Sequence, residues 1–183
     1  STQGVSSAAS DVYKRQVFLQ TSIRYAMDQI DDIDRRILRE LQVNARATFD
    51  ELAPAVGLSA SAVLRRVKRL EASGVIVGYR AVIAPKAVGK TLLAYINVRL
   101  EKHGTNALHS PMDQFRASVQ AWPEVIDCVA LTGEMDFLLR VVVSDMDHFS
   151  HFISETLLRH PAVRDCRSSF VLDAVKRDVG LPI

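Results

Sequence analysis

The spacing of hydrophobic residues changes near the middle of this sequence. In residues 27–84 they recur every three or four positions, as Ile33, Ile37 and Leu41 do, and this period predicts amphipathic helices. In residues 91–178 they alternate in steps of two over several stretches, beginning with residues 92–100, and this period predicts strands. We therefore expect a helical domain and an α+β domain, joined by a linker at residues 85–90.

The composition is that of a globular protein. Of the 183 residues, 48% are hydrophobic and 24% are charged, which excludes collagen-like, low-complexity and wholly disordered chains. No stretch approaches the roughly 18 consecutive apolar residues of a membrane span, so we expect no membrane partner and a cytoplasmic protein. Residues 1–26 are Ser-rich and lack a sustained period, and we expect a disordered extension or one derived from an expression vector. Residues 179–183 are expected to form a short tail.

Helix-capping residues divide the first domain into three helices. Thr48 and Glu51 form a capping box that begins the second helix, in which Pro54 is expected no later than the first turns. Gly57 can adopt the positive φ that ends a helix, and Ser59 can cap a third helix that runs to about residue 73. Residues 75–83 then predict one strand or two short ones, so the domain has the order of a winged helix-turn-helix.

The third helix has a basic face. At 100° per residue, Val63, Val67 and Leu70 point inward. The same wheel points five residues outward: Ser61, Ala62, Arg65, Lys68 and Arg69. Small residues at the start of a helix allow it to enter a DNA major groove, where arginine binds guanine or phosphate. Because the whole chain has a formal net charge of only +2, DNA binding has to come from this local cluster. The alternative is a solvated basic face without a partner.

The second domain is predicted to have the ferredoxin-like order β-α-β-β-α-β. The expected strands are residues 92–100, 125–131, 137–143 and 163–172, and the helices are capped by Ser110 and Asp145. Helices cover only one face of such a sheet, so we expect a second copy of the chain to cover the other. The second and fourth strands lie at opposite edges of the sheet, so we expect no disulfide between Cys128 and Cys166.

The connection between the second and third strands, residues 132–136, is a candidate ligand site. Backbone N–H groups around Gly133 can hold a carboxylate and Asp136 can hold an ammonium, a combination that fits an α-amino acid. A plain hairpin turn is the alternative. His148 and His151 lack further metal ligands at a recognisable spacing, so we expect no metal. The sequence has no nucleophile motif and no phosphate-binding loop, so we expect neither an enzyme nor a cofactor.

Short motifs occur in a fixed order along both domains. They are residues 31–38 (DDIDRRIL), 44–46 (NAR), 51–53 (ELA), 57–61 (GLSAS), 65–71 (RRVKRLE), 74–76 (GVI), 132–136 (TGEMD) and 170–172 (FVL). Over about residues 27–178 this set resembles the Lrp/AsnC, or feast/famine, family of transcription regulators. The extension before Met27 and, to a lesser degree, Pro54 depart from the family pattern.

The resemblance implies a regulator that binds double-stranded DNA and responds to a small effector, commonly an amino acid, bound between subunits. It also implies a homodimer that assembles further, often to an octamer or another higher oligomer. The candidate DNA-binding residues are Ser59, Ser61, Ala62, Arg65, Arg66, Lys68 and Arg69. The candidate effector-binding residues are Leu131, Thr132, Gly133, Glu134, Asp136 and Ser168.

Two other functions are alternatives to this one. Some haem-biosynthesis decarboxylases resemble the two-domain fold, and a fold alone does not decide function. An enzyme, however, has no use for Arg65, Lys68 and Arg69 pointing outward beside small residues. A protein that compacts DNA without an effector would keep the helix and would not need a polar pocket at Gly133.

Overall fold

A computed structural model describes residues 30–101, 110–176 and 180–183 of the chain. These residues form two compact units, one made of the described residues up to Ala81 together with those after Arg177, and one of Val82–Lys176. The expectation for residues 1–26 lies outside the described residues. Residues 180–183 belong to the first unit, where the Gln42 amide donates to the Leu181 carbonyl at 3.1 Å.

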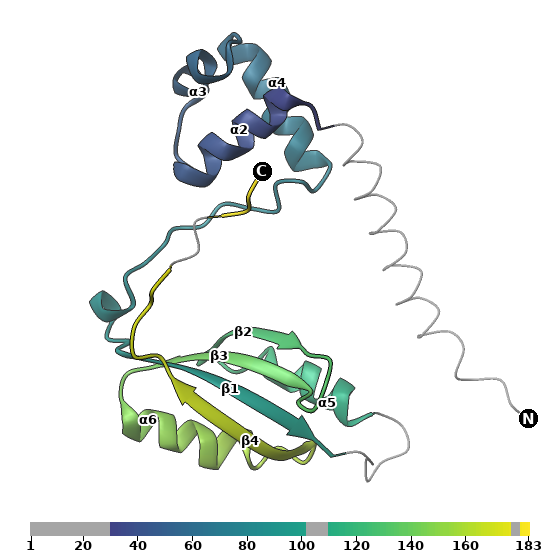
Figure 1. Cartoon of the computed structure of the whole chain (residues 1–183), viewed down its shortest axis with the longest axis vertical. Helices are drawn as coiled ribbons and strands as arrows, with labels where there is room; N and C mark the ends of the chain where they lie inside the picture. The colour runs from purple at the N-terminus through teal and green to yellow at the C-terminus, as the bar shows by residue number, and fades with distance from the viewer. Residues whose placement is uncertain (1–29, 102–109, 177–179) are drawn as a thin grey trace, which may run out of the picture. The chain divides into compact units, whose positions relative to one another are not determined.

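The described residues of the first unit form three helices (Figure 1), and the second and third begin at the predicted caps. They are α2 (Asp32–Val43), α3 (Phe49–Val56) and α4 (Ala60–Ala72). Asp31 and Asp34 form a capping box at the start of α2, and Thr48 and Glu51 form another at the start of α3. Ser59 caps α4 by accepting a hydrogen bond from the backbone of Ala62. These contacts satisfy backbone donors that the first turn of a helix otherwise leaves unpaired.

The core of the first unit confirms the inward face of α4. Val63, Val67 and Leu70 are buried, and they pack with Leu52 of α3 and Ile37 of α2. Between α3 and α4 the chain turns at Gly57, whose φ of 71° lies in the left-handed region that favours glycine. Pro54 lies in the second turn of α3, in keeping with the expectation that it stands no later than the first turns. A helix of eight residues loses one internal hydrogen bond there.

The strand predicted at residues 75–83 is absent. Val75 and Ile76 bend back so that both backbone N–H groups donate to the Leu70 carbonyl at 3.0 Å. Beyond them the backbone has no regular structure, and Val77 and Val82 are 94% and 93% exposed. The β-forming residues are present, but the described chain offers no neighbouring strand to pair with them. The predicted linker then contains a short 3₁₀ helix, η1 (Pro85–Val88).

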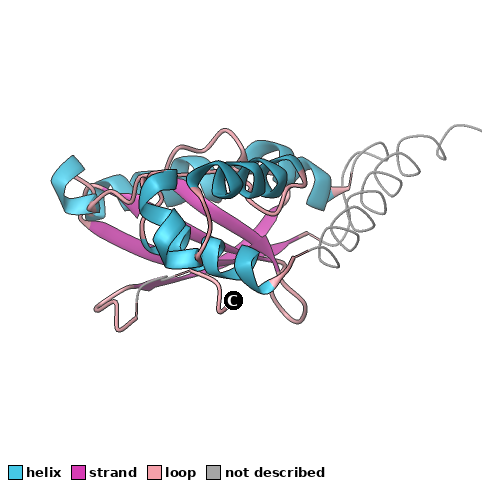
Figure 2. Ribbon diagram, turned by 90° about the horizontal axis from the view of Figure 1, so that it is seen from above, coloured by secondary structure: helices cyan, strands magenta, loops and turns pink. Residues whose placement is uncertain are grey.

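The second unit confirms the ferredoxin-like order. Its elements are β1 (Leu92–Leu100), α5 (Pro111–Val119), β2 (Val125–Ala130), β3 (Phe137–Val143), α6 (Met146–His151), the π-helical continuation η2 (Phe152–Leu157) and β4 (Val163–Phe170). The strands form one antiparallel sheet in the order β2-β3-β1-β4, and they are magenta in Figure 2. The helix predicted after Asp145 therefore changes to the wider π form at Phe152.

One face of this sheet is packed and the other is open. Ala94, Ile96 and Val98 of β1 are buried in a core with Phe115 of α5 and Phe152 of η2. The residues between them point to the opposite face, where Tyr95 is 37% exposed. Strand order also confirms the expectation for the cysteines, since Cys128 on β2 and Cys166 on β4 lie at opposite edges and both are free thiols.

Among the helices of the described residues, none has both the length and the apolar character of a membrane span.

Candidate functional site

The exposed face of α4 carries small residues at its start and two cations further along. Ser61 follows the Ser59 cap, and the two hydroxyl oxygens lie 3.1 Å apart. Arg65 and Lys68 are exposed on the side of α4 that carries Ser61, because four and seven residues return to nearly the same direction on a helix. Within the described part of the chain, neither cation has a hydrogen bond or an ion pair. This face therefore offers two free positive charges and room for close approach.

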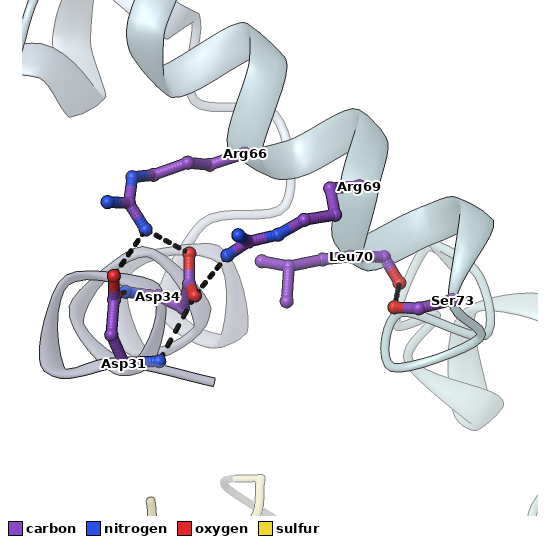
Figure 3. A network of polar contacts seen from close by, with 6 residues as sticks. All are labelled: Asp31, Asp34, Arg66, Arg69, Leu70 and Ser73. Carbon is purple, nitrogen blue, oxygen red and sulfur yellow. Dashed lines mark hydrogen bonds and ion pairs between the residues drawn. The ribbon is translucent and has the colours of Figure 1, made fainter. Parts of the chain in front are cut away.

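Arg66 and Arg69 are engaged differently from the sequence expectation. Arg66 Nη1 lies 2.7 Å from Asp31 Oδ2 and 2.9 Å from Asp34 Oδ1, and Arg69 Nη2 is bonded to Asp34 Oδ2. Figure 3 shows both side chains running from α4 to the start of α2. The helical wheel placed Arg69 among the outward residues, and its side chain is 46% exposed, but its charge is paired with Asp34 inside the unit.

The carboxylate of Asp34 is the centre of this contact. It is fully buried, and besides the two guanidinium groups it accepts a hydrogen bond from the Asp31 backbone at 3.2 Å. The two aspartates raise the pKa of Arg66 above its ordinary value. A hydrogen bond from the Asp34 backbone, followed by the charge of Arg66, holds the pKa of Asp31 below its ordinary value. A buried charge needs such partners, so the network fixes α4 against α2.

A cleft of about 510 Å³ lies at one end of the sheet in the second unit. The cleft is lined by the end of β1 and the residue after it (Arg99, Leu100 and Glu101), by the cap and first residues of α5 (Ser110, Pro111 and Met112), by the loop before β3 (Gly133, Glu134 and Asp136), and by Arg164 of β4. Both signs of charge therefore meet in one hollow, beside the apolar side chain of Met112. Of the candidate effector residues, the fold brings Gly133, Glu134 and Asp136 together here.

Asp136 has a structural contact in this cleft. The backbone N–H of Leu100 donates to Asp136 Oδ2 at 2.7 Å, and the Asp136 N–H donates to the Val98 carbonyl at 2.9 Å. The Leu131 N–H closes the loop by donating to the Asp136 carbonyl at 2.8 Å. One carboxylate oxygen of Asp136 is therefore committed to β1. The expected ammonium contact has only the other oxygen available.

Arg99 is a cleft residue that the sequence reasoning missed. Its Nη2 forms an ion pair with Glu134 Oε1, and its Nη1 lies 3.8 Å from Asp165 Oδ2. Its Nε is buried and has no hydrogen-bond partner among the described residues. The available signal was an arginine inside an alternating apolar strand, but the partner Glu134 lies 35 positions away. Gly133, beside Glu134, has a φ of 114°, so a side chain at that position would be strained.

Three other candidate effector residues do not line the cleft. Leu131 and Thr132 belong to the same connection but lie outside its walls. Ser168 lies on β4 opposite Ile96, away from the end of β1 that forms the cleft.

His148 and the two cysteines lie in surroundings that do not form a metal site. His148 Nε2 lies 3.1 Å from Glu124 Oε1 and its Nδ1 lies 3.2 Å from Ser144 Oγ, so His148 links α6 to the residues around it. Burial raises the pKa of the Cys128 and Cys166 thiols, which disfavours the thiolate form. Over residues 30–101, 110–176 and 180–183, no group of three or more His, Cys, Asp or Glu could hold a metal ion.

Both units match known protein families. The AsnC-type helix-turn-helix domain matches residues 30–71, and the Lrp/AsnC ligand binding domain matches residues 93–181. The first match spans α2, α3 and all but the last residue of α4, and the second spans the cleft and all of the sheet except Leu92.

Relatives match along most of the chain. The leucine-responsive regulatory proteins of Salmonella typhimurium and Escherichia coli are each 38% identical over 154 residues, which is 84% of this chain and 92% of theirs. A transcriptional regulator of Neisseria meningitidis, solved in complex with L-methionine, is 44% identical with a TM-score of 0.79, over 84% of this chain and 97% of that one. A feast or famine regulatory protein of M. tuberculosis, also complexed with L-methionine, is 36% identical with a TM-score of 0.72, over 81% and 96%. The chain therefore belongs to the Lrp/AsnC family of transcription regulators.

Proposed function

We propose that this protein is a sequence-specific DNA-binding regulator whose activity responds to an amino acid bound in the cleft of the second unit. The observation that carries the proposal is that the four cations of α4 fall into two pairs with different surroundings. Arg66 and Arg69 are paired within the unit, and Arg65 and Lys68 are left exposed beside Ser61. A helix that holds its position through one pair of arginines can present the other pair of cations to DNA.

Arg65 and Lys68 are the proposed contacts to DNA. Arginine can bind guanine or phosphate with a two-pronged hydrogen bond, and lysine supplies a point charge to phosphate. Ser59, Ser61 and Ala62 are small enough to let the start of α4 approach the base edges. Arg66 and Arg69 support this contact by holding α4. The cytoplasm is the proposed location, because the relatives are regulators of bacteria, whose DNA lies in the cytoplasm.

An α-amino acid is the proposed effector, and L-methionine is the first to test. Two solved relatives, at 44% and 36% identity, are complexes with L-methionine. The cleft offers charges of both signs, which suit a zwitterion, and Met112 beside them suits an apolar side chain.

A homodimer is the proposed assembly, with the effector site at its subunit contact. The open face of the sheet exposes apolar side chains such as Tyr95 and Ile126, which is 54% exposed. A second copy related by a two-fold axis would cover this face and would set the distance between two copies of α4. We also propose that such dimers assemble into an octamer or another higher oligomer. We infer a regulator rather than an enzyme because both family matches are to domains of transcription regulators.

The test combines selection of DNA with effector titration. Random-sequence selection on the full chain supplies a DNA ligand, and fluorescence anisotropy then measures its affinity with and without each of the twenty amino acids. We expect one or a few amino acids to change the affinity at least about fivefold, the low end of typical couplings between sites. A protein that selects no DNA sequence would refute the sequence-specific function. If a DNA sequence is selected but no amino acid changes the affinity for it, the proposal of an amino-acid effector is refuted.

A further inference from the structure

We propose that Arg99 and Glu134 form a recognition pair that an α-amino acid enters by separating them. The carboxylate of the ligand replaces Glu134 on the guanidinium of Arg99, and the freed Glu134 binds the ligand's ammonium. This inference rests on the proposed function, since it assigns the groups that recognise the effector. Arg99 thereby becomes the residue that selects for a carboxylate, and Glu134 the residue that selects for an amine.

The two members of the pair differ in how firmly they are held. The side chain of Arg99 is 23% exposed and rises from the end of β1, and that of Glu134 is 72% exposed on the loop before β3. Asp165 of β4 lies 3.8 Å from Arg99 Nη1, whereas Glu134 contacts Nη2. Exposed ion pairs contribute little to stability, with a typical value of at most about 1 kcal/mol. Glu134 can therefore leave at low cost, and Arg99 stays in place.

The hydrogen bonds of Arg99 are incomplete while Glu134 is bound. Glu134 bonds only Nη2, and the buried Nε has no partner in the part of the chain that the structure describes. A carboxylate that approaches a guanidinium side-on accepts from Nε and from one Nη together. A ligand carboxylate in that position would satisfy the unpaired donor, which Glu134 does not do. The hydrogen bond gained by Nε favours the state in which the ligand carboxylate has replaced Glu134 on Arg99.

The rest of the cleft suits the other two parts of an amino acid. Glu101 lines the same hollow as Glu134, so two carboxylates are available for the ammonium. Asp136 contributes less, because its Oδ2 is bonded to the Leu100 backbone. Met112 and Pro111 at the start of α5 give an apolar wall for a side chain such as that of methionine. The recognition pair fixes the backbone end of the ligand, and this wall contacts its side chain.

The experiment measures three ligands against four forms of the full chain by isothermal titration calorimetry. The ligands are L-methionine, L-methionine amide, which lacks the carboxylate, and the 2-hydroxy analogue of L-methionine, which lacks the amine. The proteins are the unmodified chain, Arg99→Gln, Glu134→Gln and the control Arg159→Gln. Arg159 pairs with Glu155 at 2.7 Å at the end of η2, so the control removes an exposed ion pair that does not line the cleft.

We expect Arg99→Gln to lose the preference for a carboxylate and Glu134→Gln to lose the preference for an amine. Arg99→Gln should weaken L-methionine by about tenfold to a hundredfold and leave the amide unchanged, because the amide lacks the group that Arg99 binds. Glu134→Gln should weaken L-methionine by about tenfold and should not weaken the 2-hydroxy analogue, which has no ammonium and meets a free Arg99. Arg159→Gln should bind all three ligands as the unmodified chain does.

The outcomes separate this inference from the proposed function. If the unmodified chain binds none of the three ligands and none of the twenty amino acids, the proposed effector class fails and the recognition pair fails with it. If it binds L-methionine and both variants keep its affinity and its order of preference, only the recognition pair is overturned. A uniform loss for all three ligands in both variants would also overturn it. If Arg99→Gln fails to fold, Glu134→Gln still tests the inference, because Glu134 is exposed and its replacement should not disturb the fold.

Discussion

Replacing Asp34 with alanine should loosen the whole first unit while leaving its surface charges in place. The carboxylate is fully buried and accepts from Arg66, from Arg69 and from the Asp31 backbone. Breaking a buried ion pair costs about 3–5 kcal/mol when the surviving charge stays buried. Here the surviving guanidinium groups are 25% and 46% exposed and can be rehydrated. We therefore expect the free energy of unfolding to fall by about 2–4 kcal/mol.

Hydrogen exchange followed by mass spectrometry measures this change in the unit concerned. Peptides from α2 and α4 report opening of that unit, whereas Trp122 and the sheet belong to the other. A loss of about 2 kcal/mol accelerates exchange of the slowest amides about thirtyfold. Asp34→Asn, which keeps one oxygen as an acceptor, should show a smaller effect. Peptides of β1 and β3 should not change.

Asp32→Ala is the matched control for this experiment. Asp32 is an acidic residue in the same first turn of α2, but it is exposed, so its removal should cost at most about 1 kcal/mol through the helix dipole. If Asp34→Ala accelerates exchange in α2 and α4 no more than Asp32→Ala does, the buried network does not hold the two helices together. The assignment of Arg66 and Arg69 as positioning residues would then be wrong.

Three further changes test other parts of the structure. Lys68→Gln should flatten the dependence of log K on log salt by about 0.9 if Lys68 meets one phosphate, as a filter-binding titration measures; an unchanged slope would exclude that contact. Asp136→Ala should lower the melting temperature more than Asp136→Asn, because only the alanine leaves the Leu100 N–H without an acceptor. Burial lowers the pKa of His160 below its ordinary 6.5, so the neutral ring stabilises the fold above that value and the contribution is lost as the pH falls through the lowered pKa. Calorimetry of the unmodified chain and of His160→Gln between pH 7.5 and about 5 checks this, and equal pH dependence of the two would contradict it.

The neutral form of His160 also follows from its contacts. The Ala162 N–H donates to His160 Nδ1 at 3.2 Å, so this nitrogen has to be unprotonated. His160 Nε2 lies 3.0 Å from Ser118 Oγ, and the ring packs edge-on against Phe115 and Trp122. A second proton on the ring would place two donors against each other in partly apolar surroundings. The hydrogen bonds and the direction of the pKa shift therefore agree.

Local signals in the sequence predicted the elements well. The caps at Thr48, Ser59 and Ser110 act within three residues of themselves, so their effect can be inferred without knowing the fold. The strand spanning residues 92–100 and the one spanning 137–143 have the predicted bounds, because each is a mainly apolar run that ends at polar residues. Residues 75–83 show the limit of such signals. They contain β-forming residues, but a strand also needs a neighbour, and the pattern of one segment does not supply it.

Contacts between distant residues were beyond the reach of the sequence. Asp34 is 32 positions from Arg66 and 35 from Arg69, and a helical wheel of α4 does not contain the carboxylate that draws these side chains inward. Arg99 and Glu134 are likewise 35 positions apart. The glycine loop was predicted to be a ligand site from its own residues, but the ion pair that Glu134 forms there needs an arginine contributed by another strand.

The pairing of arginines on α4 also limits what one copy of the chain can do on DNA. Residues 59–72 carry four cations and one acidic residue, a local formal charge of +3. Asp31 and Asp34 pair with two of these cations, so Arg65 and Lys68 remain as the proposed phosphate or base contacts. Two phosphate contacts would give a salt-dependence slope of only about −1.8, the range of weak and non-specific binding. Two copies of α4 held by the second units would double this slope and add a second half-site. An amino acid in the cleft could then control DNA binding by favouring one arrangement of the two copies, provided that it binds that arrangement more tightly.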